Sequence, residues 1–286
     1  MITQTVIYGI IKIKLSKERR NIPMDSVYSF NTINVEITDD IAVVKFARPK
    51  QLNALNTEMT AELTALFDRF AEDDNVRGII LTGEGRSFMA GADISEMVEW
   101  GCAEGREFAR LSNKAFSNIA DISKPVICAI NGFALGGGFE LSLCCDWRIA
   151  SENAVLGAPE LNIGIIPSGG GTQRLARLIG SGRAKELIFT GKKLYAYDAE
   201  KIGIVNKVVK ADELMDEAFA EMRDVLSHSS VALKYAKESI NSGLDVDLKT
   251  GIGIEVNAVG MVFASEDKNE GVKAFLEKRK PKFKNR

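Results

Sequence analysis

The stretch KPVICAINGFALGGGFELSLCCD, from Lys124 to Asp146, contains three structural signals in succession. Residues 125–130 form a short apolar run, which predicts a buried strand. NGFALGGG predicts a glycine-rich loop, and residues 139–145 predict an apolar helix. Glu140 lies in the first turn of that helix, directly after the glycines. The question is what a single carboxylate does at the start of an apolar helix.

The same order of strand, loop and helix recurs on both sides of this stretch. A predicted strand at residues 78–82 precedes the loop GEGRSFMAGAD and a helix-rich stretch over 94–121. The loop GIIPSGGG, residues 164–171, also precedes a helix. Two short strands near the N-terminus, 35–37 and 41–46, predict a hairpin, and a capped helix is expected to run to about residue 72. The pattern predicts an α/β fold with helices connecting the strands.

From about residue 212 the pattern becomes helical only. Helices are expected at 212–226, 230–241, 248–264 and 267–279. We therefore divide the chain into a core over 24–210 and a C-terminal helical subdomain over 211–286. The basic run KRKPKFKNR at the end is interpreted mainly as a solvated tail.

Composition excludes several classes of function. The 286 residues are 45% hydrophobic and carry a net charge of −2, so no basic field indicates a nucleic-acid partner. Apolar runs all fall short of the roughly 20 residues that span a membrane. Four cysteines without a CxxC pair indicate reduced thiols of a cytoplasmic protein, and the one histidine, His228, is expected at the surface and excludes a His-rich metal site. We predict no metal site and no nucleic-acid or membrane partner.

Residues 1–23 form an extension outside the regular pattern. A short apolar segment is followed by basic residues, which is the wrong order for a secretory signal. A second methionine, Met24, stands just before the regular pattern starts. We interpret the extension as a disordered tail or a mis-assigned start, and detection of residues 1–23 in the native protein by mass spectrometry would refute the second interpretation.

The glycine loops match neither of the two common nucleotide motifs. Gly136–Gly138 does not continue as GxGxxG, and neither this loop nor the one ending at Gly171 continues as GK[ST]. Glycines before a helix instead leave free backbone N–H groups that can stabilise a developing oxyanion. A second N–H group from the loop 90–93 would complete such a site. For either loop alone, tight turns and close packing are at least as good an explanation.

Two glutamates are candidates for proton transfer beside this site. Glu140 follows the three glycines, and Glu160 lies in the apolar context LGAPEL. A pair of partly buried carboxylates suits general acid–base chemistry, because burial can keep one protonated while the other is ionised. Taken singly, each is explained as well by a charge at a helix start or a loop carboxylate, and spacing alone does not bring them together.

The long ordered motifs of the chain resemble those of the enoyl-CoA hydratase, or crotonase, family. They are RPKQLNALN (48–56), AGADISEM (90–97), the opening stretch, and GAPELNIGIIPSGGGTQRLARLIG (157–180). The resemblance implies a crotonase-like spiral of β-β-α units whose C-terminal helices form a homotrimer or a homohexamer. It also implies acyl-CoA thioester substrates and no separate cofactor, since coenzyme A is part of the substrate.

The resemblance assigns roles to individual residues. The backbone N–H groups of Ala92 and Gly137 correspond to the oxyanion hole, and Glu140 and Glu160 to the two catalytic glutamates of the hydratases. The expected reaction is reversible syn addition of water to a trans-2-enoyl-CoA, with Glu140 handling water and Glu160 the proton at C2. Further contacts with CoA or substrate are expected from Ala92, Asp93, Ile94, Ser95 and Gly137, from Lys50, and from Phe275 and Lys278 toward a neighbouring subunit.

Departures from the family pattern concern the acyl pocket. Ala158 stands where glutamine is common in hydratases, and Phe139 stands where a smaller residue is common. Phe139 could narrow the pocket or pack in the core, and we favour packing in the core. Met97 and Trp100 are candidates for lining it. The alternatives are an enoyl-CoA isomerase, a hydratase of a carnitinyl or cyclic acyl-CoA, and an RNA-binding homologue, which is disfavoured because the helix after residue 57 is acidic.

Overall fold

A six-stranded sheet forms the centre of the protein in a computed structural model that describes residues 28–286. Its strands lie in the order β1-β2-β3-β5-β7-β10. Their bounds are Ile33–Thr38, Ile41–Phe46, Gly78–Gly83, Val126–Ile130, Trp147–Ser151 and Lys207–Val209. β1 and β2 form the predicted antiparallel hairpin, and the other pairings are parallel. Residues 1–23, interpreted above as an extension, lie outside the described residues.

A second sheet of short strands runs beside the first. It contains β4 (Ser87–Met89), β6 (Phe133–Leu135), β8 (Val155–Gly157) and β9 (Leu194–Tyr195), in that order. Successive strand pairs β3/β4, β5/β6 and β7/β8 thus contribute one strand to each sheet, which is the spiral of β-β-α units that the family resemblance implies. The segments of β4 and β6 were predicted as glycine-rich loops, which is wrong, because three-residue strands show no periodicity.

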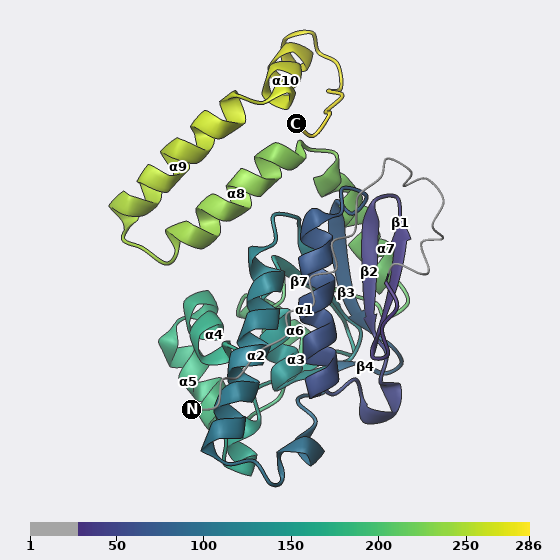
Figure 1. Ribbon diagram of the computed structural model, residues 1–286, viewed down its shortest axis with the longest axis vertical. Coiled ribbons are helices and arrows are strands. Elements are labelled where there is room, and N and C mark those ends of the chain that lie inside the picture. The colour runs from purple at the N-terminus through teal and green to yellow at the C-terminus, as the bar shows by residue number, and fades with distance from the viewer. Residues whose placement is uncertain (1–27) are drawn as a thin grey trace, which may run out of the picture.

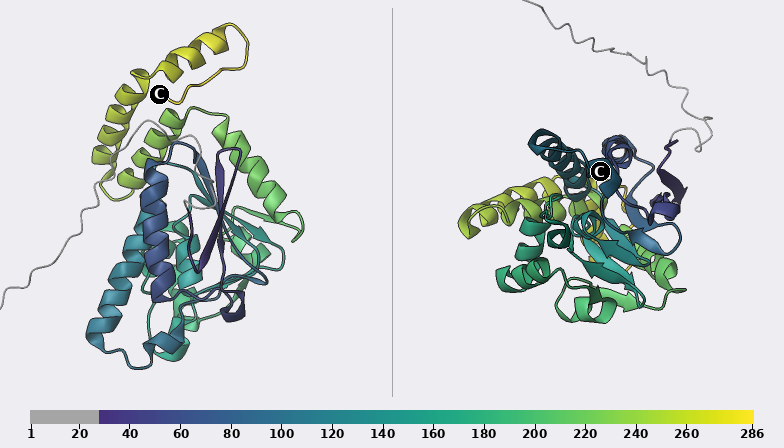
Figure 2. Two further views of the ribbon diagram at one scale, coloured as in Figure 1. Left: turned by 45° about the vertical axis from the view of Figure 1, so that its right-hand side comes forward. Right: turned by 90° about the horizontal axis from the view of Figure 1, so that it is seen from below.

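Helices cover the core sheet on its two faces (Figures 1 and 2). α1 (Thr57–Glu72) and α2 (Cys102–Asp121) lie side by side, and α1 buries an apolar face that includes Leu63, Phe67 and Phe70. Asn56 begins α1 by accepting the backbone N–H of Met59 at 2.9 Å. The helices α3 (Gly137–Ser142), α4 (Gly171–Ile179), α5 (Ser181–Thr190) and α6 (Ala196–Lys201) complete this part of the fold.

The C-terminal helices divide between the core and a projecting arm. α7 (Leu214–Leu226) packs Leu214, Ala218 and Met222 against the sheet. α8 (Ser230–Gly243) and α9 (Leu248–Phe263) form a hairpin with no buried residue, and α10 (Glu266–Leu276) follows at its far end. Figure 1 shows α9 and α10 standing away from the core, whereas α8 is held to it by Lys237, which pairs with Asp146 at 3.0 Å, and by Asn241, which donates to the carbonyl of Ala120 at 3.1 Å.

The basic C-terminal run, residues 278–286, is exposed at seven of its nine residues, as predicted for a mainly solvated tail, but its backbone is folded back onto α10. The buried carboxylate of Asp267 accepts the backbone N–H groups of Lys284 at 2.6 Å and Asn285 at 3.0 Å. Arg279 pairs with Glu270 at 2.6 Å. The sequence pattern showed the charge of this segment but not the carboxylates that bind it.

The burial of the cysteines and the exposure of the histidine were also predicted from composition. Cys128, Cys144 and Cys145 are buried free thiols, whereas Cys102 is exposed, and His228 is exposed as predicted. None of the helices within residues 28–286 has the length and apolar character needed to cross a membrane.

Candidate active site

A cavity of about 240 Å³ lies where α2, the start of α3 and the segments after β4 and β8 meet. Its walls are largely apolar, with Leu55, Met97, Phe108, Phe116 and Leu135 among the lining residues. The polar groups that face it come from four segments, and they include Ala92, Gly137, Glu140, Glu160, Ser112 and Ser168. An apolar cavity with a few converging polar groups is the usual form of a small-molecule site.

Two backbone N–H groups, those of Ala92 and Gly137, lie together at this cavity. A Cβ atom placed on Gly137 would be 3.8 Å from the backbone nitrogen of Ala92. Within residues 28–286 neither N–H group meets an acceptor, and that of Gly137 begins α3, where it has no partner inside the helix. The two predicted oxyanion-hole donors are therefore adjacent and unpaired.

Close packing explains why glycines occupy this corner. A Cβ atom on Gly138 would stand 2.0 Å from the carbonyl oxygen of Met89, at the end of β4. One on Gly136 would stand 3.4 Å from Glu160 Oε1, and its φ of +51° is left-handed. Only glycine at position 138 allows the first turn of α3 to approach β4 so closely, and the positive φ at position 136 favours glycine there.

Glu140 is buried and held by backbone donors. Its carboxylate oxygen Oε1 accepts the N–H groups of Gly169 and Gly171, both at 2.8 Å. Burial is the largest cause of a pKa raised to about 7; the N–H groups of Gly171 and Gly169 oppose it, and the neighbouring Glu160 adds to it. Glu140 can therefore exchange a proton near neutral pH in a fixed orientation.

Glu160 is buried without such donors. It begins the short helix η4 (Glu160–Ile163), and within the described chain neither carboxyl oxygen meets a hydrogen-bond partner. Burial raises the pKa of Glu160, and its own backbone N–H, which opposes this effect, lies outside hydrogen-bond geometry. A carboxyl group with no donors is favoured in its neutral, protonated form.

Several other predicted site residues lie at the cavity or beside it. Ile94 and Met97 line the cavity, and the Asp93 carboxylate is paired with Arg48 at 2.9 Å and bonded to Ser95. Trp100 lines a neighbouring hollow, and its ring packs at a tilt against that of Phe108, which borders both spaces.

Three predicted contacts lie away from the cavity. Lys50 is exposed on η2 (Pro49–Gln51), and Phe275 and Lys278 belong to the region of α10, at the opposite end of the molecule from η3 (Ile94–Met97) (Figure 1). Phe139 is buried in the core, as preferred above, and does not line the cavity.

Comparison with known proteins gives the family. Residues 36–286 match the family described as enoyl-CoA hydratase/isomerase. The chain belongs to this enoyl-CoA hydratase/isomerase family. A short-chain-enoyl-CoA hydratase of Clostridium acetobutylicum is 48% identical over 258 residues, which are 90% of this chain and 99% of the relative. A crotonyl-CoA hydratase of Syntrophomonas wolfei is 44% identical over 89% of this chain and 98% of the relative.

Solved structures of hydratases share the fold. An enoyl-CoA hydratase from Bacillus anthracis is 41% identical, with a TM-score of 0.86 over 90% of this chain and all of that one. The family and the fold predicted from the sequence are thus confirmed.

Sequence reasoning missed the residues that hold the site together. The sequence pattern predicts only a third glycine loop at Gly169 and Gly171, although these two residues supply both donors to Glu140. The motif RPKQLNALN contains Arg48 but predicts no role for it. The glycine run before α4 was the available signal, because free N–H groups at a helix start favour a carboxylate.

Proposed function

We propose that this member of the enoyl-CoA hydratase/isomerase family is an enoyl-CoA hydratase, which adds water reversibly and syn across the double bond of a trans-2-enoyl-CoA. The observation that carries the proposal is the meeting of two buried carboxyl groups and two unpaired backbone N–H groups at one apolar cavity. The names of the hydratase relatives support the same activity.

The chemistry follows from the charges of the reaction. When water attacks C3, the electrons of the double bond move toward the thioester oxygen, which gains negative charge. The N–H groups of Ala92 and Gly137 would donate to that oxygen, and losing one such donor typically costs about 10²–10³ in rate. Coenzyme A is part of the acyl-CoA substrate, so the proposal involves no separate cofactor.

The surroundings of the two glutamates support different roles. Glu140, held by two N–H donors, is suited to be the ionised base. It would take a proton from water while the water oxygen bonds to C3. Glu160, without donors, is suited to be the acid that gives a proton to C2. After turnover one proton has moved from water to Glu140 and one from Glu160 to product, and proton exchange restores the pair.

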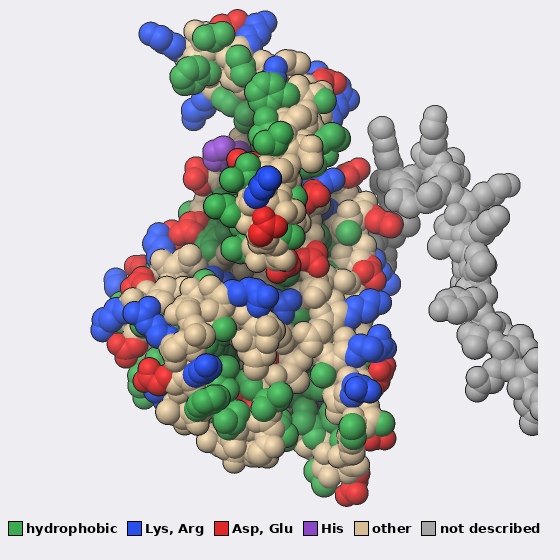
Figure 3. Space-filling model, turned by 90° about the vertical axis from the view of Figure 1, so that its left-hand side faces the viewer, with side chains coloured by type: hydrophobic (Ala, Val, Ile, Leu, Met, Phe, Trp, Pro, Cys, Tyr) green, Lys and Arg blue, Asp and Glu red, His purple; other side chains and the backbone are tan. Residues whose placement is uncertain are grey.

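We also propose a homotrimer or a homohexamer built from trimers. Ile252, Val256, Val259 and Phe263 recur along one side of α9 at helical spacing, and each is about half exposed or more. Figure 3 shows hydrophobic side chains gathered on the projecting arm. In such an assembly Lys278 and Phe275 would serve the CoA of a neighbouring subunit, with Lys50, Ile94, Ser95 and the backbone of Asp93 contributing within the chain.

A cytoplasmic location is part of the proposal. It rests on the three buried free cysteines, which suit a reducing compartment.

Hydration of crotonyl-CoA tests the activity. Turnover removes the conjugated double bond, so the ultraviolet absorbance of the enoyl thioester should fall. A matched assay offers 3-hexenoyl-CoA, whose conversion by an isomerase would raise the same absorbance. Absent hydration of crotonyl-CoA together with fast isomerisation would replace the hydratase proposal with the isomerase, and turnover of only carnitinyl or cyclic enoyl-CoA would move it to an unusual acyl group.

A further inference from the structure

Two segments that precede the cavity are joined side by side. The backbone N–H of Ala90 donates to Leu52 O at 3.0 Å, Leu55 N–H donates to Gly91 O at 2.8 Å, and Asp93 N–H donates to Leu55 O at 2.8 Å. Leu55 and Ala92 therefore face each other in a parallel bridge.

This bridge decides where the Ala92 N–H points. In parallel pairing, a residue bonds to the two neighbours of the residue it faces. Leu55 uses both of its backbone groups on Gly91 and Asp93, so the N–H of Ala92 turns to the other side. The position of the segment around Leu55 thus sets the position of an oxyanion-hole donor.

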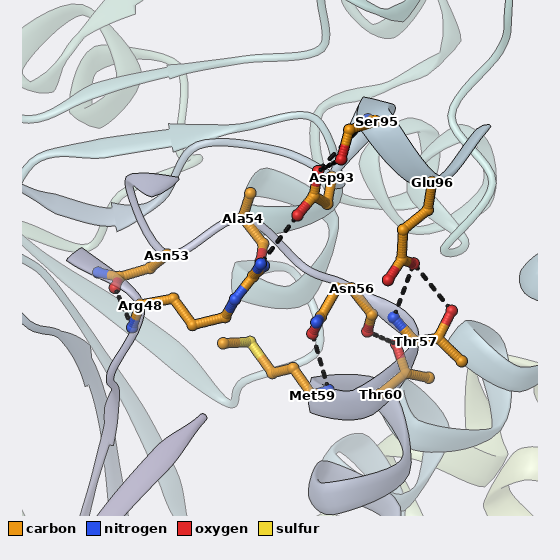
Figure 4. Close-up of polar contacts among 10 residues, drawn as sticks. All are labelled: Arg48, Asn53, Ala54, Asn56, Thr57, Met59, Thr60, Asp93, Ser95 and Glu96. Carbon is orange, nitrogen blue, oxygen red and sulfur yellow. Dashed lines mark hydrogen bonds and ion pairs between the residues drawn. The ribbon is translucent and has the colours of Figure 1, made fainter. Parts of the chain in front are cut away.

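One side chain connects the two segments at this point (Figure 4). The guanidinium of Arg48 donates through Nη1 to the carbonyl of Ala54, the residue before Leu55. Through Nη2 it donates to the carboxylate of Asp93, the residue after Ala92, at 2.9 Å. Arg48 and Asp93 side chains are each only 17% exposed, so the pair is shielded from water. Asp93 also accepts Ser95 Oγ at 2.6 Å, which fixes the carboxylate.

We propose that Arg48 is a positioning residue for the oxyanion hole, which holds the Ala92 N–H in place by fastening Ala54 to Asp93. This inference rests on the proposed function, since it assigns a purpose to the proposed donor. It also gives the Asp93 side chain a role in positioning rather than in contact with CoA.

The geometry requires arginine. Its planar fork reaches a carbonyl and a carboxylate at once, whereas a lysine ammonium is a single point of attachment. Replacement by lysine should therefore restore only part of the effect of removing the guanidinium.

The loop keeps other anchors when the guanidinium is removed. Buried Asn53, at φ +59°, donates through Nδ2 to Ser87 O at 2.7 Å and to Glu84 O at 2.9 Å, and its Oδ1 accepts the Arg48 backbone N–H. Glu96 accepts the N–H and hydroxyl of Thr57 on the far side of the bridge. Arg48 variants are therefore expected to fold with the segment loosened rather than lost.

The experiment measures carbonyl polarisation and turnover in the same full-length proteins. Butyryl-CoA labelled with ¹³C at the thioester carbonyl cannot be hydrated, and its infrared stretch moves to lower frequency when N–H groups donate to it. We expect a clear shift with wild type and a smaller one with Arg48→Met, with Arg48→Lys between them. In hydration of crotonyl-CoA, kcat should fall about 10- to 100-fold for Arg48→Met, as for a small displacement of a catalytic group, while KM changes less.

Arg223→Met is the matched control, because it removes an arginine from an exposed pair with Asp39. It should leave both the shift and kcat unchanged. Asp93→Asn provides a second test, because it removes the carboxylate that Arg48 binds and keeps the shape of the side chain. It should reduce the infrared shift and kcat as Arg48→Met does, and it takes the place of that variant if Arg48→Met is unstable.

The outcomes separate the two proposals. A full shift and unchanged kcat in Arg48→Met and Asp93→Asn would overturn the role of Arg48. No shift in the wild type would instead overturn the oxyanion hole itself.

Discussion

Glu140 and Glu160 are both buried carboxyl groups at one cavity, but their partners differ. Glu140 accepts two backbone N–H groups, whereas Glu160 has no donor in hydrogen-bond geometry among the described residues. Sequence reasoning found both residues, since each stands in an apolar context where a charge is unexpected. It left their roles to the family resemblance, because the donors to Glu140 come from a loop 29 and 31 residues away.

The raised pKa of Glu140 predicts a pH-dependent stability. With a folded pKa of about 7 against a usual 4.5, the folded protein binds a proton that the unfolded chain does not. The contribution of this group to the free energy of unfolding is therefore fully present below about pH 4.5 and is lost as pH rises through about 7. We expect the melting temperature of Glu140→Gln minus that of wild type to be a few degrees larger at pH 8 than at pH 5, as measured by calorimetry.

An exposed glutamate controls for this measurement. Lys284 and Arg286 lower the pKa of Glu266, so that group stays ionised over the same range. Glu266→Gln should keep a constant difference from wild type, and an equally constant difference for Glu140→Gln would contradict the proposed burial effect.

Among the elements of the spiral, the long helix α1 was predictable and the shortest strands were not. The 16 residues of α1 carry a periodic apolar face and were found. β4 and β6 have three residues each, and glycines on both sides made them resemble loops. Their pairing with one another depends on strands from separate turns of the spiral, which local sequence does not reveal.

The approach of α3 to β4 gives a prediction for two glycines. Gly138→Ala places a methyl group 2.0 Å from the Met89 carbonyl oxygen, so the free energy of unfolding should fall by about 1–3 kcal/mol or more. Gly105→Ala, inside α2 with no atom within 4 Å of the new Cβ, should instead raise it by about 0.5–1 kcal/mol. Denaturant unfolding of both variants measures the difference, and equal effects would contradict the described packing.

The whole molecule places its site and its unburied arm at different ends. The cavity lies at the α2–α3 end of the core, while α8 and α9 have no buried residue and α9 projects from it (Figure 2). The helical character of this region followed from the sequence pattern. The exposure of the apolar face of α9 did not, because the periodicity of a helix does not tell whether its apolar face is covered within the same chain.

A charge on this arm should weaken assembly. Val256 is 64% exposed on α9, and Val256→Glu would put a carboxylate in the proposed interface between subunits. We expect wild type to sediment as a trimer or hexamer and the variant to shift to smaller species. Lys249→Glu, an exposed change at the start of α9, should leave the mass unchanged. A monomeric wild type would contradict the proposed assembly.

Hydration of crotonyl-CoA by wild type, Glu140→Gln and Glu160→Gln, compared side by side, tests the two-carboxylate site most directly. Loss of a true acid or base should lower kcat by at least about 10²–10⁴ in each variant, while labelled butyryl-CoA still binds with its carbonyl stretch shifted. Turnover within a few-fold of wild type in either variant would contradict the two-carboxylate mechanism.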